Sequence, residues 1–380
     1  VAATTAGDGD GAAMRRAVRR LSLGAASEVE RKEAAGEVGR LARSDERTKR
    51  ALPELGVVPP LVSMLADAGA GAGARLAAAR ALLELARGTH RSVSQNKVHI
   101  VKAGLLKKLP KLMDLSTSHD LALLLLSVSS LANTDFPLST ADLLPFLVAT
   151  LGAADVPADT RLACLAALRN LSAKLEHVRA VVTSGAVRAL LAPSLMEHTE
   201  TTAEAALAVL ADVAAASAAG RREMAEDEEA PRALVEAMAR HESAGCQEHA
   251  TYLVMALAHG GGGGRALLRR MRQLGAVQAL LEVSLLGSPL ARSRAAKILQ
   301  WFKDDGQDRI RAHSGPRMEA CHGNDGGADG TKACRSAVDR IVKQSLDMNM
   351  RSIMRRATAS VDMTNAKQLV ASSSSKSLPC

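Results

Sequence analysis

One amide stands near the end of an apolar, helix-forming stretch, in a position where it could read a peptide backbone. The stretch LACLAALRNLSA runs from Leu162 to Ala173, and Asn170 is its only amide. An Asn side chain both donates and accepts hydrogen bonds, so it can pair with the backbone groups of an extended peptide. The same side chain can instead make a local hydrogen bond to an adjacent loop of a structural repeat. Which of these two interpretations holds depends on the helices and loops that surround Asn170.

Candidate zinc ligands and glycine-rich stretches also occur in the sequence, but they lack the spacing that a zinc site or a phosphate loop needs. Four residues towards the carboxyl end could be imagined as a zinc set: His313, Cys321, His322 and Cys334. Their spacing matches no standard zinc motif, and the segment is rich in Gly and Asp, which favours disorder. The glycine-rich stretches at Gly7, Gly69 and Gly260 neither follow a predicted strand nor lead into GK[ST], so they do not predict a phosphate loop. We therefore expect no metal site, no cofactor and no enzymatic activity.

The composition predicts helices packed at close range. Of the 380 residues, 47% are hydrophobic but only 1% are aromatic, so Leu, Ala, Val and Met must build the core. The five cysteines are odd in number and widely spaced, which argues against a disulfide framework; Cys164 and Cys246 lie in apolar helices and are interpreted as small buried hydrophobes. No apolar run is long enough to cross a membrane. We expect a cytoplasmic or nuclear protein, or one found in both compartments.

One sequence motif recurs along the chain and marks the repeated helical units to which Asn170 and the other candidate residues belong. Its four clear copies are ELGVVPPLVSML at Glu54, KAGLLKKLPKLM at Lys102, TSGAVRALLAPSL at Thr183 and QLGAVQALLEVSL at Gln273. Weaker copies begin at Asp142 and Ala230, which gives a period of roughly 40 to 48 residues. A long stretch rich in Ala and Leu follows each copy at helical spacing. Each unit is thus predicted as a short helix, a sharp turn at the Gly, a second helix, a loop and a long third helix.

The order of the predicted helices, the length of the period and the positions of the turn residues resemble the armadillo repeat. The resemblance implies an all-α, armadillo-type α-solenoid, a right-handed superhelix of three-helix repeats with disordered ends. The expected divisions are a basic leader over 1–27, a solenoid of a capping helix plus about six repeats over 28–303, and a largely disordered tail over 304–380. A capping box at Ser27 and Glu30 marks the start of the capping helix. The third helices are expected to line a groove.

Armadillo proteins that bind nuclear localisation peptides repeat an Asn on their third helices, with a Trp four residues earlier. Aligning the third helices of this chain places only Asn170 at the Asn position, and no Trp at the other position. Asn170 is therefore interpreted as a remnant of the repeat pattern with a local bond. Groove chemistry specific to another partner stays open, with candidates Arg80, Glu84, Asp212, Tyr252 and Gln300 beside Asn170. For each candidate alone, a solvated helix surface is the alternative.

A finer resemblance is carried by LLEVSLLGSPLARSRAAKILQWFKDD (Leu280–Asp305) and the terminal SSSSKSLPC. Both resemble a plant group related to the armadillo regions of U-box ubiquitin ligases. A U-box docks the ubiquitin-conjugating enzyme and precedes the repeats. We identify none here, because 1–27 is too short to hold one, and members of this group can lack it. Ligase activity is therefore not implied for this chain.

The net charge of +9 lies mostly towards the ends of the chain and predicts no nucleic-acid surface. Near 334–357 we expect a basic amphipathic helix whose candidate contact residues are Val338, Val342, Leu346, Ile353, Arg355 and Arg356. Such a helix can bind calmodulin or an anionic membrane surface, or it can dock back on the solenoid. RRLS and RRAT suggest phosphorylation at Ser22 and Thr358.

Two functions follow as expectations. The first is a non-catalytic scaffold that binds partner proteins through the solenoid groove. The alternative is the substrate-recognition region of a plant U-box ubiquitin ligase whose U-box is absent or truncated. The sequence names no partner for either.

Overall fold

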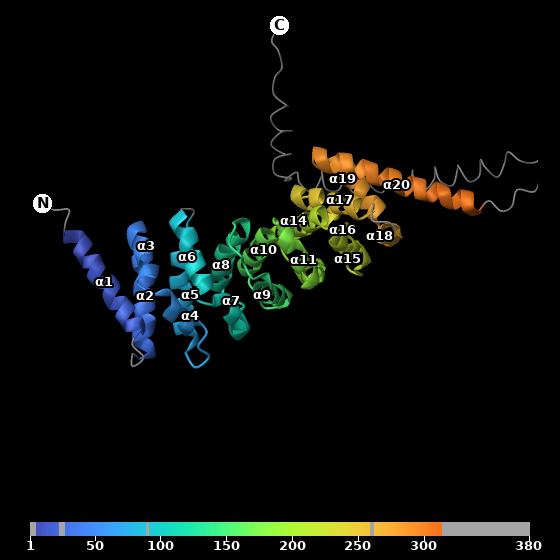
Figure 1. Cartoon of the computed structure of the whole chain (residues 1–380). Helices are drawn as coiled ribbons and strands as arrows, with labels where there is room; N and C mark the ends of the chain where they lie inside the picture. Colours follow the sequence, from blue (N-terminus) through green and yellow to red (C-terminus); the bar gives the residue numbers. More distant parts are fainter. Residues whose placement is uncertain (1–4, 23–26, 89–90, 259–261, 314–380) are drawn as a thin grey trace, which may run out of the picture.

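The structure, a computed structural model, describes residues 5–22, 27–88, 91–258 and 262–313. Within these ranges every regular element is a helix, and no strand occurs. The helices are stacked in chain order from one end of the molecule to the other (Figure 1). The predicted all-α class is confirmed.

The helices fall into three classes by their place in the repeat. The first helices are α3 (Glu46–Glu54), α6 (Arg91–Lys102), α11 (Leu175–Thr183), α15 (Ala218–Glu226) and α18 (Gly262–Gln273). The second helices are α4 (Val58–Leu65), α7 (Leu105–Lys108) with the 3-10 helix η1 (Leu109–Leu115), α9 (Thr140–Gly152), α12 (Ala186–Leu191) with α13 (Pro193–Met196), α16 (Ala230–Ala239) and α19 (Ala276–Leu286). The third helices are α5 (Ala72–Ala86), α8 (His119–Ser129) with η2 (Ser130–Asn133), α10 (Ala158–Ser172), α14 (Glu200–Ala216), α17 (Ala244–Ala258) and α20 (Pro289–His313). Six repeats follow α1 (Thr5–Ser22) and α2 (Glu28–Ser44), and the chain is an armadillo-type α-solenoid.

Glycine sets the turn between first and second helix wherever the repeated motif is complete. Gly56, Gly104, Gly185 and Gly275 have φ values of 82°, 87°, 78° and 87°. A side chain with a Cβ atom is strained in this left-handed region, whereas glycine is not. The predicted sharp turn is confirmed at all four positions.

The third repeat departs from the predicted three-helix unit. Residues 134–139 lead from η2 directly into α9, so no first helix precedes this second helix. The segment is short and contains Pro137, which has no backbone N–H to donate within a helix. The unit therefore has only its second and third helices.

The amino end of the chain is helical where we expected a disordered leader. α1 packs on α2 and buries Ala17 and Leu21, which lie one turn apart on one face. Burial of this apolar face on a neighbouring helix overrides a weak helix propensity.

The capping box at the start of α2 is confirmed. The Ser27 hydroxyl oxygen accepts a hydrogen bond from the Glu30 backbone N–H at 3.3 Å, and the Glu30 carboxylate accepts one from the Ser27 backbone N–H at 2.8 Å. Both backbone donors would otherwise have no partner at a helix start. Hydrogen bonds from the Ser27 backbone N–H and hydroxyl to the Glu30 carboxylate hold the pKa of this carboxyl below its usual value.

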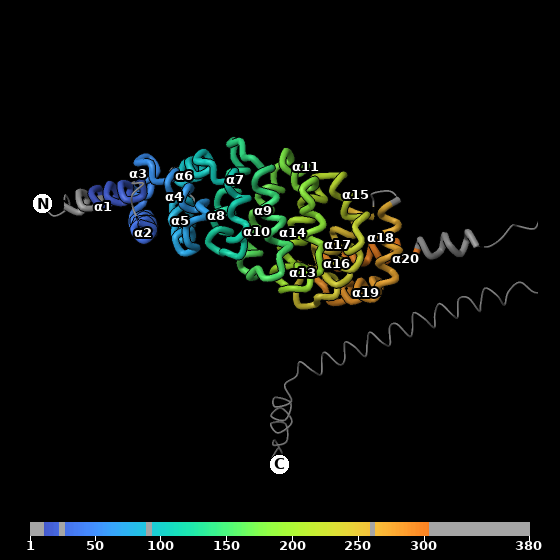
Figure 2. The backbone as a smooth tube through the Cα atoms, turned by 90° about the horizontal axis from the view of Figure 1, so that it is seen from below, coloured from blue at the N-terminus to red at the C-terminus, as the bar shows by residue number. Residues whose placement is uncertain are grey.

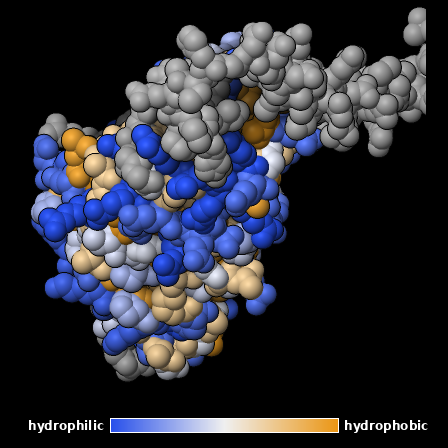
Figure 3. All heavy atoms as spheres, turned by 90° about the vertical axis from the view of Figure 1, so that its right-hand side faces the viewer, coloured by the Kyte–Doolittle hydropathy of each residue, from blue (hydrophilic) through white to orange (hydrophobic). Residues whose placement is uncertain are grey.

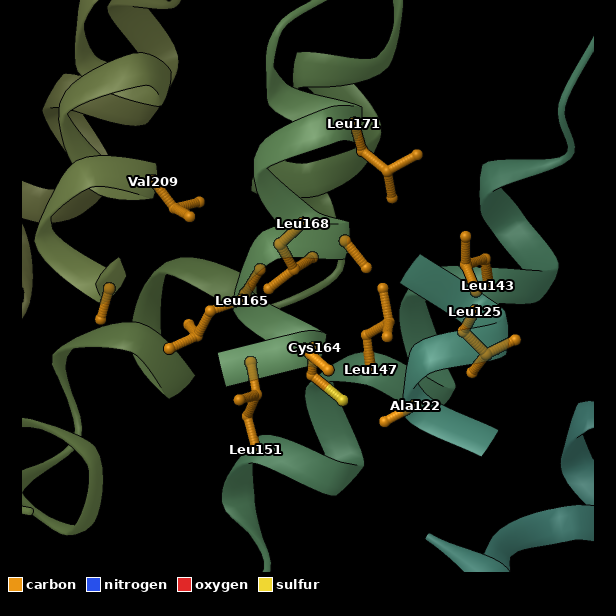
Figure 4. Close-up of a cluster of buried hydrophobic side chains, with 14 of the residues drawn as sticks. Ala122, Leu125, Leu143, Leu147, Leu151, Cys164, Leu165, Leu168, Leu171 and Val209 are labelled. Carbon is orange, nitrogen blue, oxygen red and sulfur yellow. The ribbon is translucent and has the colours of Figure 1, made fainter. Parts of the chain in front are cut away.

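One continuous apolar core runs through the stack. Figure 4 shows its middle, where Leu125 of α8, Leu147 of α9 and Leu168 of α10 belong to the same buried cluster. Cys164 lies among them with no exposed surface, and burial raises the pKa of its thiol to about 12. Cys246 is also buried, so the interpretation of both cysteines as small hydrophobes is confirmed.

A buried arginine joins neighbouring elements where the second helix ends. Arg161, in the first turn of α10, is only 2% exposed. Its guanidinium donates to the carbonyl oxygens of Ala153 at 3.0 Å and Ala154 at 2.9 Å, just after α9. It also donates to the Ser194 carbonyl at 3.2 Å, in the next repeat. These carbonyls lie where the helical ladder leaves acceptors unpaired.

Two other third helices repeat this arrangement in their own first turns. Arg75 of α5 donates to the Leu65 carbonyl at 3.0 Å, at the end of α4, and forms an ion pair with Asp114 of η1. Gln247 of α17 donates to the Met238 carbonyl at 3.3 Å in α16. The first turn of the third helix thus secures the end of the second helix in at least three repeats.

The carboxyl-terminal helix is longer than predicted, because α20 continues past residue 303 to His313. Phe302 is buried, and the Arg272 guanidinium lies 5.1 Å from the centre of its ring. Residues 314–380 lie outside the described ranges.

We expect Arg161→Met to lower the free energy of unfolding by about 3 kcal/mol, because three carbonyl oxygens lose a charged donor that is itself buried. The matched control is Arg169→Met on the same helix. The Arg169 side chain is 61% exposed and forms one ion pair, so its loss should cost less than about 1 kcal/mol. Urea unfolding followed by far-ultraviolet circular dichroism measures both. Equal losses would show that Arg161 does not have this role.

Candidate functional site

The exposed sides of the third helices form one surface, which we call the third-helix face. It is built from α2, α5, α8, α10, α14, α17 and α20, which pack in sequence along the stack (Figure 2). The residues predicted to line the groove lie on these helices. Their side chains are described below by what they contact.

Ion pairs cross the third-helix face from one repeat to the next. Arg80 of α5 contacts Asp120 of α8 at 2.6 Å. Arg169 of α10 contacts Asp212 of α14 at 3.3 Å. Each pair spans close to one repeat period in sequence. Two of the predicted groove residues, Arg80 and Asp212, are therefore engaged by a neighbouring helix. Exposed pairs of this kind contribute about 0 to 1 kcal/mol each.

Glu84 is the most enclosed of the predicted groove residues, at 7% exposed. Its carboxylate accepts from Arg43 of α2 at 2.8 Å and from Arg87 at 3.3 Å. The hydrogen bond and charge of Glu84 raise the pKa of Arg43. Glu84 therefore joins α2 to α5, and its charge is already neutralised.

Asn170 is bonded within the repeat array. Its side-chain amide donates to the Ser129 hydroxyl at 2.9 Å, at the end of α8. We expected a local bond to a loop; the partner is the end of the preceding third helix instead. The difference follows from the close packing of α8 on α10, which brings the ends of the two helices together.

Tyr252 lies in an open hollow of about 890 Å³ on the third-helix face. The hollow is formed by the end of α14, the start of α15, and parts of α17 and α20. Its lining residues are Ala214, Ala215, Ala218, Ala219, Arg221, Arg222, Tyr252, Met255, Ala256 and Arg294. Tyr252 and Ala256 are the residues of α17 that the sequence alignment placed at the Trp and Asn positions.

The remaining predicted residues either do not line the hollow or lie outside the described residues. Gln300 is exposed on α20, and Ser22 is exposed at the end of α1. The tail-helix residues, Thr358, Cys321, His322 and Cys334 lie outside the described residues. His313 is the last residue of α20. Within the described ranges, no group of three or more His, Cys, Asp or Glu is placed to hold a metal ion.

The described part of the chain has no helix that is both long and apolar enough to span a membrane.

Most of the residues that line the hollow could not be predicted from the sequence. Arg221 and Arg222 come from a first helix, whereas Met255 and Arg294 come from two different third helices. In the sequence, only the adjacent arginines of GRRE, at residues 220–223, indicated a local positive charge. The fold is what places them beside Tyr252.

Comparisons with known proteins give structural likenesses alone. No family model matches the chain, and no curated protein matches it. A designed armadillo repeat protein in complex with peptide (KR)4 is 18% identical, with 76% of this chain and 98% of that chain covered and a TM-score of 0.40. Computationally designed armadillo repeat proteins for modular peptide recognition are 19% identical, with 76% and 98% covered and a TM-score of 0.42. An engineered protein is 18% identical, with 81% and 85% covered and a TM-score of 0.47.

We expect Asn170→Ala to leave the affinity for a labelled basic localisation peptide unchanged, because Asn170 is bonded to Ser129 and the described third helices carry no Asn–Trp ladder. The same change should cost about 1 kcal/mol of stability through loss of one hydrogen bond. Fluorescence anisotropy and urea unfolding measure the two effects. Ser129→Ala is the matched control and should give a similar stability loss. A large loss of peptide binding on Asn170→Ala alone would contradict this assignment.

Proposed function

We propose that this chain is a non-catalytic scaffold that binds partner proteins along its third-helix face. The observation that carries the proposal is the face itself. Six repeats and the preceding α2 align their third helices side by side, and a hollow opens among them near α17. A long surface of this kind suits an extended peptide or a helix, since either ligand needs contacts repeated at regular intervals.

The chemistry of the described residues supports binding rather than catalysis. Both buried cysteines have raised pKa values, so neither thiol is activated as a nucleophile. The polar groups along the face mainly pair with each other across repeats.

A second candidate is the substrate-recognition region of a plant U-box ubiquitin ligase. Only the sequence resemblance over Leu280–Asp305 and the terminal SSSSKSLPC favours it. This candidate needs the same binding face, and it differs by requiring a U-box in the same protein. Detection of ubiquitin transfer by the full-length natural protein, with a ubiquitin-conjugating enzyme supplied, would distinguish it from the scaffold.

We expect peptides selected from a phage-displayed library on the full chain to bind the third-helix face. The test variant carries Ala166→Gln, Ala215→Gln and Ala256→Gln, one change on each of α10, α14 and α17. The control carries Ser63→Gln, Ser194→Gln and Ala239→Gln on second helices, where all three residues are exposed. Both variants gain side-chain bulk without a change of charge. The face variant should weaken binding at least about tenfold, equivalent to about 1.4 kcal/mol, and the control should not.

Circular dichroism establishes that both variants keep the helical content of the parent. If the library yields no binder, or if binders are lost equally from both variants, the third-helix face is not the binding surface.

A further inference from the structure

The side chains that line the hollow around Tyr252 carry positive charge and no negative charge. Three of its lining residues are arginines and none is acidic. Arg294 donates to the Glu248 carbonyl at 2.9 Å, and its guanidinium lies 5.3 Å from the centre of the Tyr252 ring. Arg221 donates to the Ala214 carbonyl at 2.5 Å. Both side chains keep their positive charge, because a carbonyl or a ring does not neutralise it.

Arg222 is exposed at the rim of the hollow and stays available to a ligand. Within the described parts of the chain, no ion pair joins Arg222 to a carboxylate, and the two acids on its own helix, Glu223 and Glu226, do not line the hollow. The acids on neighbouring third helices do not line the hollow: Asp212 pairs with Arg169, and the Glu248 carboxylate accepts from the Ser288 hydroxyl. The hollow is therefore electropositive, and it attracts an anion.

The rest of the lining is apolar. Met255 and the Tyr252 ring lie beside alanines from α14, α15 and α17. Small alanine side chains leave the space open, and the thioether and ring offer surfaces against which an aliphatic side chain can pack. Seen from the carboxyl-terminal end, the visible surface of the array is likewise mixed, with broad hydrophilic areas and smaller apolar ones (Figure 3).

We propose that this hollow binds a linear peptide segment of a partner protein in which an Asp or Glu side chain stands next to a large aliphatic one. The carboxylate pairs with Arg222, in a field that Arg221 and Arg294 reinforce, and the aliphatic side chain packs on Met255 and the Tyr252 ring. This assignment rests on the proposed scaffold function and adds the chemical class of the ligand. Charge complementarity is its basis: three guanidinium groups repel the Lys and Arg side chains of a basic peptide.

Fluorescence anisotropy with defined probes tests the assignment on the full chain. The probes are a fluorescein-labelled octapeptide of alternating Glu and Leu, and its counterpart of alternating Lys and Leu. We expect the acidic probe to bind at least about tenfold more tightly than the basic one, and its affinity to fall as salt is raised.

The decisive variant is Arg222→Gln, which removes one exposed charge that has no partner in the described chain and so leaves the fold intact. The matched control is Arg179→Gln, at the corresponding exposed position of the first helix in the preceding repeat. Arg222→Gln should weaken binding of the acidic probe about five- to tenfold, Arg222→Lys less, and Arg179→Gln not measurably.

Equal weakening by Arg222→Gln and Arg179→Gln would overturn the assignment, because it would mean diffuse attraction to a basic chain. Equal binding of the acidic and basic probes would overturn it as well. If neither probe binds while library-selected peptides still depend on the third-helix face, this assignment fails and the scaffold function stands. If no peptide depends on that face, the scaffold function itself fails.

Discussion

Each third helix in this array has to pack against its neighbours on two sides, and the rest of the structure depends on that constraint. α10 lies between α8 and α14, and its inward surface meets α9. Close approach on three sides requires Ala and Leu in place of aromatic side chains, as the composition already indicates. The buried Arg161 and its counterparts then satisfy the carbonyls at the ends of the second helices. A single repeat could not bury these surfaces alone.

The same constraint determines what is left for binding. Only one side of each third helix stays exposed, and polar residues on it meet polar residues one repeat away. The pairs Arg80–Asp120 and Arg169–Asp212 follow from this periodicity. Residues that look like ligand contacts in the sequence are thus engaged in joining repeats. Around Tyr252 the ion pairing between repeats is absent among the described residues. Arg221 and Arg294 donate to carbonyl oxygens, and Arg294 also lies over the Tyr252 ring.

Local signals in the sequence predicted much of this fold. The turn glycines, the capping box of Ser27 and the periodic apolar stretches act within one turn or one helix, so they can be recognised without a structure. Three features could not be predicted: the helix α1, the missing first helix of the third repeat, and the length of α20. The first depends on burial of Ala17 and Leu21 against neighbouring helices, which the sequence of α1 alone does not show. The hollow was missed for the same reason, because it combines Arg222 with Tyr252 from another helix.

Hydrogen–deuterium exchange of the full chain tests most directly whether third-helix packing holds the array together. Amides buried between neighbouring repeats open only when those repeats separate, whereas the ends of an array open locally. The account predicts the slowest exchange in α8, α10 and α14, slower than in the first helices α11 and α15 of the same region, and the fastest in α1 and the far end of α20. Exchange in α10 and α14 that is no slower than in α11 and α15 would contradict it.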